Sequence, residues 1–191
     1  FKPQMGNLKY EDVNNDGKLD YQDKQVLGNT IPKITYGISA GLRYKGFDLN
    51  VLFQGLGKAN VFIQDDITRM SYERMAIPTF WRDAWTPENS DSKIPMLRFD
   101  SSWDNYQSSF WTHRIDFLKL KNIQLGYAFP ESITSKLKIQ RLYVYANAQN
   151  LFTIMLRKGY EGYDPERNTF DTGAYSYPTP RIFTFGINLN F

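Results

Sequence analysis

A short stretch near the start of the chain carries residues whose types and spacing could bind a metal ion. In DVNNDGKLDYQD, oxygen-bearing side chains recur at alternate positions around a central glycine, Gly17. Calcium takes about six to eight oxygen ligands, and a loop brings them to one point only if the chain turns sharply at its middle. The expected ligands are Asp12, Asn14, Asp16, the backbone carbonyl of Lys18, Asp20 and Asp23.

The last position of this stretch departs from the EF-hand pattern, and a metal-free alternative also stays open. Asp23 stands where an EF-hand has a longer, bidentate glutamate, which is typical of a more compact loop such as that of dockerin-like repeats. Asn, Asp and Gly also dominate turns that hold no metal, because their side chains bond the local backbone or tolerate positive φ. The sequence therefore predicts either a structural Ca²⁺ site or a plain turn.

Aromatic side chains gather in two long stretches that are expected to be loops. The stretch 57–114 holds all four tryptophans, which could stack on sugar rings, fill a partner interface or pack the loop on itself. The stretch 153–180 adds a second set of polar and aromatic candidates, of which Asp164, before Pro165, is alternatively a turn residue. The candidates for ligand or partner contact are Trp81, Trp85, Trp103, Trp111, Tyr160, Tyr163 and Asp164.

Catalytic and nucleic-acid functions find little support in these residues. The single histidine, His113, has neither a cysteine nor a second histidine to work with, and no P-loop or H-E-x-x-H motif occurs. The net charge of +3 comes from scattered lysines and arginines rather than a basic block. We therefore predict a protein that is not an enzyme and does not bind nucleic acid.

The elements that position these candidates are strands with a period of two. ITYGISAGLRY alternates apolar and polar residues over its whole length, and a Lys45-Gly46 turn joins it to FDLNVLFQG as a hairpin. In IDFLKLKNIQLGYAFP, Leu118 and Leu120 fall out of phase with the residues after them, and a bulge near Lys121 would restore the register. The expected strands are about 34–44, 46–56, 115–129, 139–152 and 181–191.

Strand length and connection length favour a membrane β-barrel over a soluble sandwich. Each strand is about ten residues long, as a tilted membrane-spanning strand is. The connections alternate between short and long, which is typical of periplasmic turns and extracellular loops. On this reading residues 1–33, with the Asp-rich loop, and the stretches 57–114 and 153–180 lie outside the cell, while 34–191 otherwise forms barrel strands. The strand at the end, PRIFTFGINLNF, carries a candidate barrel-assembly signal: Phe183, Phe185, Ile187, Leu189 and Phe191.

Several segments, taken in order, resemble the C-terminal part of SusC/RagA-like TonB-dependent outer-membrane transporters. They are DVNNDGKLDYQDKQVLGNTIPKITYGISAGLRYKGFDLNVLFQG, FWRDAWTPENSDSKIPMLRF, FLKLKNIQLGYAFP, LYVYANAQNLFTI with GYEGYDPE, and YPTPRIFTFGINLNF. The resemblance implies an antiparallel barrel of about 22 strands, plugged by an N-terminal domain and energised through TonB. It also implies a SusD-like surface lipoprotein that binds glycan or peptide.

The resemblance sets the partners that we expect. Five strands are too few to close a barrel, so the rest of the wall, the plug and the TonB contact are expected in residues outside this sequence. The remaining expected partners are the SusD-like lipoprotein, outer-membrane lipid and an oligosaccharide or peptide substrate, in the outer membrane of a Gram-negative bacterium. The rival hypothesis is a calcium-stabilised extracellular β-sandwich that binds glycans.

Overall fold

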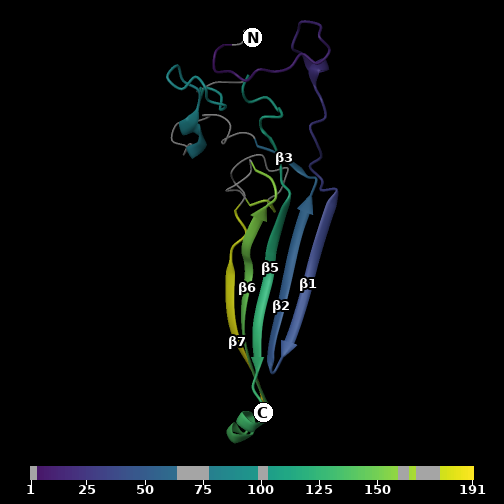
Figure 1. The fold of residues 1–191 in the computed structure, drawn as a ribbon, viewed down its shortest axis with the longest axis vertical. Coiled ribbons are helices and arrows are strands. Elements are labelled where there is room, and N and C mark those ends of the chain that lie inside the picture. The colour runs from purple at the N-terminus through teal and green to yellow at the C-terminus, as the bar shows by residue number, and fades with distance from the viewer. Residues whose placement is uncertain (1–3, 64–77, 99–102, 159–163, 167–176) are drawn as a thin grey trace. The chain divides into compact units, whose positions relative to one another are not determined.

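A computed structural model of the chain describes residues 4–63, 78–98, 103–158, 164–166 and 177–191 (Figure 1). The chain divides into two compact units. The first, which we call the loop unit, comprises Phe1–Thr30, Asn60–His113 and Asn168–Ser176. The second, which we call the sheet unit, comprises Ile31–Ala59, Arg114–Arg167 and Tyr177–Phe191.

The sheet unit is built on one antiparallel sheet of five strands in the order β1-β2-β5-β6-β7. Chain neighbours among these strands are also spatial neighbours, as Figure 1 shows. The predicted all-β antiparallel class is confirmed, and each strand lies within a few residues of its predicted range. The strands are β1 (Ile34–Tyr44), β2 (Phe47–Gly57), β5 (Phe117–Ala128), β6 (Arg141–Met155) and β7 (Ile182–Asn190).

The first hairpin turns on two residues, as its sequence predicts. Lys45 and Gly46 both have positive φ, 47° and 86°, which suits a turn whose twist matches that of the flanking strands. A Cβ added at Gly46 would press on the carbonyl of Ala128, so glycine is required there for space as well as for conformation. The turn fixes the register in which Tyr44 faces Phe47.

The predicted bulge in the third long strand is also confirmed. On the β2 side, the register passes from Leu52 opposite Asn122 to Phe53 opposite Leu120, so Lys121 is the extra residue. The register with β6 shifts at the same point. The insertion returns Leu118 and Leu120 to the face that Ile123 occupies further along.

A short helical turn, absent from the predicted elements, fills the connection between β5 and β6. It consists of α1 (Glu131–Thr134) and the 3₁₀ turn η4 (Ser135–Leu137). The turn ends at Lys138, whose left-handed φ of 56° cannot continue a helix. Four helical residues are too few to leave a periodic signal in sequence. None of the helices in the described ranges has the length and apolar character needed to cross a membrane.

The loop unit has few regular elements and an aromatic core. Its elements are η1 (Tyr21–Asp23), β3 (Asn60–Phe62), η3 (Thr79–Asp83) and β4 (Thr112–Arg114), whose last residue groups with the sheet unit. Strands β3 and β4 pair inside the stretch expected to be an irregular loop; three-residue strands are too short for alternation to reveal. Phe62, Trp81, Ala84 and Trp111 form the buried cluster.

The first described residues are held within the loop unit. The carboxylate of Asp104 accepts the backbone N–H of Leu8 (2.6 Å) and the side-chain N–H of Asn7 (2.7 Å). Asp104 is 2% exposed, so these charge-assisted bonds are shielded from water. These hydrogen bonds connect the N-terminal segment to Asp104, about a hundred positions later in the chain.

Candidate functional site

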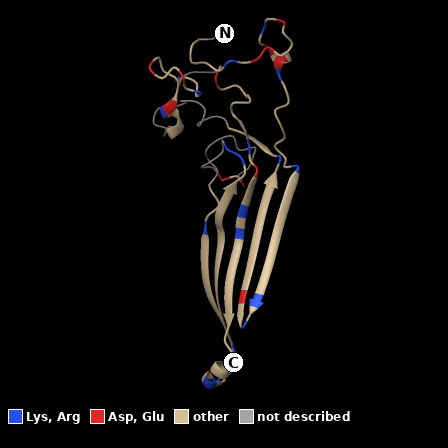
Figure 2. Ribbon diagram, in the orientation of Figure 1, with Lys and Arg blue, Asp and Glu red and all other residues tan. Residues whose placement is uncertain are grey.

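The sheet has one apolar face that runs across all five strands. Cross-strand pairs such as Leu42 with Leu49, Val51 with Ile123, and Ala146 with Phe185 place the apolar residues on a single side. Their side chains remain largely exposed: Phe185 is 81% exposed and Ile187 is 66% exposed. Most of the strand length carries no charged residue (Figure 2). An exposed apolar surface of this extent is unusual in a water-soluble protein and marks a surface meant to be covered.

Aromatic rings lie in a row at one end of this apolar face. Tyr44 faces Phe47, which faces Tyr127 on the next strand. The rings of Phe47 and Tyr127 lie 4.5 Å apart, and those of Tyr127 and Phe129 lie 4.9 Å apart. We call these residues the aromatic row. They stand at the end of the sheet where the short connections lie.

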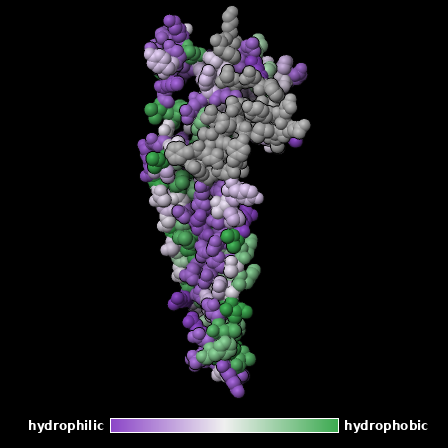
Figure 3. All heavy atoms as spheres, turned by 180° about the vertical axis from the view of Figure 1, so that it is seen from behind, coloured by the Kyte–Doolittle hydropathy of each residue, from purple (hydrophilic) through white to green (hydrophobic). Residues whose placement is uncertain are grey.

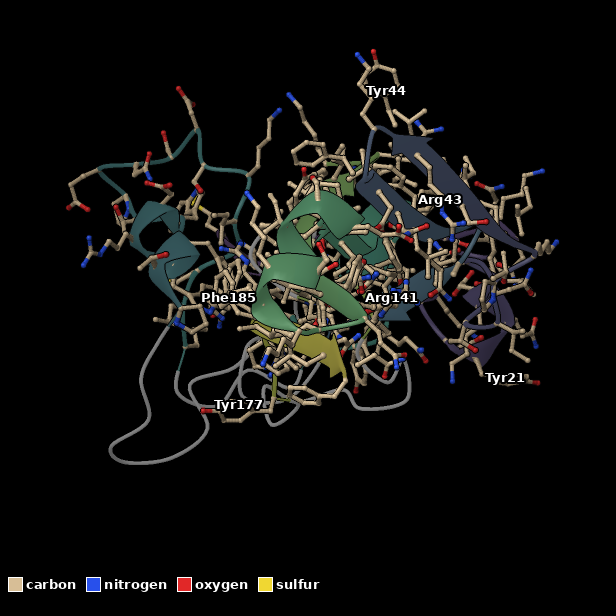
Figure 4. The ribbon with its side chains drawn as sticks, turned by 90° about the horizontal axis from the view of Figure 1, so that it is seen from below. Tyr21, Arg43, Tyr44, Arg141, Tyr177 and Phe185 are labelled. Carbon is tan, nitrogen blue, oxygen red and sulfur yellow. The ribbon has the colours of Figure 1, made fainter. Side chains whose placement is uncertain are left out.

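The opposite face of the sheet is polar and carries its own hydrogen-bond network. The Tyr143 hydroxyl donates to Asp48 (3.0 Å) and accepts from the amide of Gln124 (3.3 Å). Further along, the Asn147 amide donates to Asn122 (2.7 Å). Figure 3 shows hydrophilic residues running along the strands of the sheet. In Figure 4, Tyr44 and Phe185 point away from the side of the sheet that holds Arg43 and Arg141.

Two tyrosines lie flat over glycines of the neighbouring strands on the polar face. A Cβ added at Gly126 would collide with the ring of Tyr143, and one added at Gly186 would collide with the ring of Tyr145. The tyrosine rings are stacked on each other, with centroids 5.9 Å apart and planes 27° apart. The glycines thus leave the space that the rings fill, and rings laid over glycines stiffen an otherwise weak part of a sheet.

Two lysines of β5 hold residues 164–166, from the connection between β6 and β7, against the sheet. Lys119 Nζ lies 2.7 Å from Glu166 Oε2 and 3.4 Å from Asp164 Oδ1, and the bulged Lys121 lies 2.9 Å from Glu166 Oε1. The Lys119 side chain is only 4% exposed, so these carboxylates take the place of water around its ammonium group. We call these four residues the lysine cluster. The sequence showed both lysines in an apolar strand but gave no sign of their partners.

Asp164 also closes a turn within the same connection. Its carboxylate accepts the backbone N–H of Glu166 (3.1 Å) and of Thr179 (2.7 Å). Partial burial acts to raise the pKa of Asp164, but the hydrogen bonds from Thr179 and Glu166 and the charge of Lys119 outweigh it and lower the pKa. A carboxylate held in this way is ionised at neutral pH and positions its loop.

A second carboxylate, missed in the sequence, joins three strand ends. Asp116 is 7% exposed and accepts the backbone N–H of Lys58 (2.7 Å), while its Oδ2 lies 2.8 Å from Arg114 Nε. Its carbonyl accepts the N–H of Leu156 (2.8 Å). The partners lie up to 58 residues away in sequence, so no local signal could identify them.

The Asp-rich loop folds around its own backbone amides. The carboxylate of Asp12 accepts the N–H of Asp16 (3.2 Å) and of Gly17 (2.8 Å). Gly17 has φ of 79° and supplies the sharp turn at the middle of the loop that its position predicts. Asn15 also has a positive φ, 58°. The loop is therefore wound tightly at its centre.

The end of the Asp-rich loop is capped by Asp23. Its carboxylate accepts the N–H of Val13 (2.9 Å) and of Asp20 (2.8 Å), and it is the last residue of η1. The bond from the Asp20 amide is the main cause that lowers the pKa of Asp23. Within the described ranges, no three His, Cys, Asp or Glu side chains gather closely enough to hold a metal ion. The calcium site remains a prediction.

The tryptophans occupy different environments within the loop unit. Trp81 and Trp111 are 7% and 3% exposed and pack in the buried aromatic cluster, their rings 6.0 Å apart. Trp85 packs against Gly6, where an added Cβ would meet the indole ring. Trp103 is partly buried, and its indole N–H donates to the carbonyl of Leu8 (2.9 Å). Trp81 and Trp111 therefore serve packing.

Trp103 belongs to an aromatic group that borders a groove of about 1050 Å³ within the loop unit. Its ring meets Tyr10 edge-on at 5.1 Å, and Tyr106 lies 6.4 Å from Tyr10. Burial, followed by the charge of Asp104, raises the pKa of Tyr10 to about 12. The Tyr10 hydroxyl therefore stays protonated and donates to the Trp103 carbonyl (2.7 Å). Tyr106 is 57% exposed and is one of the residues that line the groove.

The remaining candidates are placed as follows. Tyr160 and Tyr163 lie outside the described residues. His113 is half-buried within β4. Side chains of the candidate assembly signal alternate along β7 and are exposed on the apolar face, except that Phe191 follows the last strand residue.

Comparisons with known proteins agree with the resemblance. No protein-family model matches the chain. The chain is 30% identical over 199 residues to TonB-dependent receptor P26 of Formosa agariphila. This alignment covers 98% of this chain and 20% of that protein. It is 29% identical over 185 residues to TonB-dependent receptor SusC of Bacteroides thetaiotaomicron, covering 95% of this chain and 17% of that one. The chain thus spans about a fifth of the length of the relatives it matches.

Solved structures agree on the fold. The RagAB peptide transporter matches with a TM-score of 0.71 at 24% identity, over 91% of this chain and 19% of the other. The RagAB peptide importer in its open-open state matches with a TM-score of 0.68 at the same identity. The resemblance to SusC/RagA-like TonB-dependent transporters is therefore confirmed, and the antiparallel strands match part of that fold. These relatives are named as receptors and importers, which fits the prediction that the chain is not an enzyme.

Proposed function

We propose that this chain forms part of the barrel wall of a TonB-dependent outer-membrane importer. The observation that carries the proposal is the exposed apolar face of a five-stranded sheet with a polar network on its other side. Each apolar side chain left in water costs free energy, about 25 cal/mol per Å². Lipid removes that cost on the apolar side, while the polar side faces a water-filled or plugged lumen.

The rival β-sandwich is less well supported. In a sandwich a second sheet covers the apolar face at a distance of about 10 Å, and the facing side chains become buried. Here Ile38 is 59% exposed, Leu125 is 52% exposed and Phe185 is 81% exposed. Among the described residues nothing covers this face in the way a second sheet would.

The proposed cargo is a glycan or peptide oligomer, captured together with a SusD-like surface lipoprotein. The similarity in sequence to SusC and in fold to the RagAB peptide importer supports this class. TonB would act through a segment outside this sequence. In the loop unit, the exposed ring of Tyr106 beside Trp103 offers a flat apolar surface of the kind that stacks on sugars or fills a partner interface.

The membrane placement is tested with the full-length protein in a Gram-negative host. We expect it in the outer-membrane fraction, resistant to alkaline wash and released only by detergent. Recovery in the soluble fraction would overturn the proposal.

Cargo and partner are tested next: we expect the lipoprotein to co-purify, and deletion of the gene to abolish uptake of labelled oligosaccharides or of labelled peptides. Uptake of neither class would refute the cargo assignment.

We also propose that the Asp-rich loop binds a structural Ca²⁺ ion. Its donors fit the ion in chemistry, because Asp12, Asn14, Asp16, Asp20 and Asp23 supply hard oxygen ligands and the loop turns at its glycine. Bound calcium would stabilise the loop by drawing these side-chain oxygens together. Terbium luminescence, excited through the exposed Tyr21, tests this binding. We expect a signal that Ca²⁺ displaces and that Asp12→Asn removes; an unchanged signal in that variant would refute the site.

A further inference from the structure

Three lysines gather where the short connections lie, outside the strands. Lys45 belongs to the β1–β2 turn, and Lys136 and Lys138 belong to the helical connection between β5 and β6. Glu131 is the single acidic residue in these two connections. Basic residues mark this end of the sheet in Figure 2. The two connections therefore present a net positive surface.

The ammonium groups of these lysines are available to an external anion. All three side chains are exposed. The ion pairs found among the described residues involve other lysines and arginines, namely Arg114, Lys119, Lys121 and Arg157. The described part of the chain therefore supplies these three lysines with no carboxylate partner.

The aromatic row fixes the depth at which the lysines would meet a membrane. The Lys45 ammonium lies 5.2 Å from the centroid of the Tyr44 ring, and that ring projects from the apolar face. Aromatic rings of membrane barrels sit at the level of the lipid headgroups. Long lysine side chains at this level extend to the headgroup phosphates. The position of Lys45 is therefore that of a phosphate-binding group on the lipid side.

The helical connection has the composition of an interfacial anchor. Ile133 is 44% exposed and Leu137 is 57% exposed, although both are apolar. They alternate with the exposed Lys136 and Lys138 over eight residues that begin at Glu131. Amphipathic segments bind anionic lipid surfaces in this way: their apolar side chains enter the boundary between headgroups and acyl chains, and their lysines lie among the headgroups.

We propose that Lys45, Lys136 and Lys138, with the apolar Ile133 and Leu137, form a binding surface for anionic phospholipid headgroups such as phosphatidylglycerol. The proposal rests on the membrane placement of the proposed function. The positive charge of these lysines favours anionic over zwitterionic lipid, because each lysine close to negatively charged headgroups adds an electrostatic attraction. The surface would bind the lipids of the leaflet at the short-connection end.

Two arginines at the same end provide a matched control. Arg43 and Arg141 occupy positions on the polar face, opposite Asp48 and Asn190, so lipid does not reach them along the apolar side. Figure 4 shows both on the side away from Tyr44 and Phe185. Removing these two charges lowers the net charge as much as removing two lysines does. A general effect of charge is thereby separated from a local one.

The test compares full-length protein reconstituted in nanodiscs of phosphatidylethanolamine with a minor fraction of phosphatidylglycerol. Lipid bound to the protein is quantified by native mass spectrometry for wild type, Lys45→Gln/Lys136→Gln and Arg43→Gln/Arg141→Gln. Lys138 is left in place because its left-handed backbone makes substitution ambiguous. We expect the lysine variant to lose on the order of ten-fold in phosphatidylglycerol preference, and the arginine variant to keep it.

Each outcome decides one question. Equal loss in both variants, or loss in neither, overturns the proposed surface while leaving the importer proposal intact. If inorganic phosphate in solution competes with phosphatidylglycerol and abolishes the preference in wild type, the lysines bind free anions, and the proposed lipid surface is overturned as well. Failure of the wild-type protein to enter nanodiscs, with recovery as soluble protein, refutes the membrane placement itself.

Discussion

The lysine cluster yields the sharpest prediction, because one substitution isolates it. Among the described residues, Glu166 is the only carboxylate that contacts both lysines, so Glu166→Gln removes their shared partner and leaves Lys119 with Asp164 at 3.4 Å. The Lys119 side chain is 4% exposed, so water cannot replace the carboxylate that it loses. Breaking a buried pair costs about 3–5 kcal/mol.

The expected cost here is smaller, because Glu166 is 20% exposed and Lys121 is 26% exposed. Asp164 also remains as a partner for Lys119. We expect about 2–3 kcal/mol of lost local stability. At 1.4 kcal/mol per factor of ten, this amounts to a roughly 30- to 150-fold more frequent opening of the connection.

Hydrogen–deuterium exchange of the full-length protein measures this opening at the Thr179 amide, which donates to Asp164. Glu131→Gln is the matched control, because Glu131 is exposed and has the same chemistry. We expect accelerated exchange in Glu166→Gln and none in the control. Lys119→Met/Glu166→Gln should recover much of the protection, since it leaves fewer unpaired buried charges. Exchange within two-fold of wild type in Glu166→Gln would refute the structural role of the cluster.

Three further predictions test the carboxylate turn, the apolar face and the tyrosine–glycine contacts. The pKa of Asp164 is lowered in the folded state, so its contribution is fully present above its unfolded pKa of about 3.9 and is lost as pH falls through the lower folded value; exchange protection of the loop it binds should hold down to about pH 4 and fall below. Phe185→Arg places a charge in the middle of the apolar face and should cost about 2–4 kcal/mol of folding free energy in vesicles, whereas Thr184→Arg on the polar face should cost little; equal costs would contradict the assignment of faces. Gly186→Ala collides with the Tyr145 ring and should destabilise by about 1–3 kcal/mol in thermal unfolding in detergent, and the same change in a Tyr145→Ala background should have much less effect.

The sequence by itself determined the sheet and its faces. Alternation with a period of two places Leu42 and Leu49 on one side of their strands, and this pattern depends only on neighbouring residues. The phase break after Leu120 predicted the bulge at Lys121 for the same reason. The Lys45-Gly46 turn was equally readable, because few residue pairs accept positive φ at both positions.

Only the tertiary structure decided the contacts that hold the connections between strands. Glu166 reaches Lys119 from 47 residues away, and Asp104 reaches Leu8 from 96 residues away, so neither pairing leaves a local pattern. The sequence left Trp111 open between ligand contact and packing, and its burial assigns it to the core. Periodicity records which face a residue occupies, whereas the choice of a distant partner depends on how the chain closes in space.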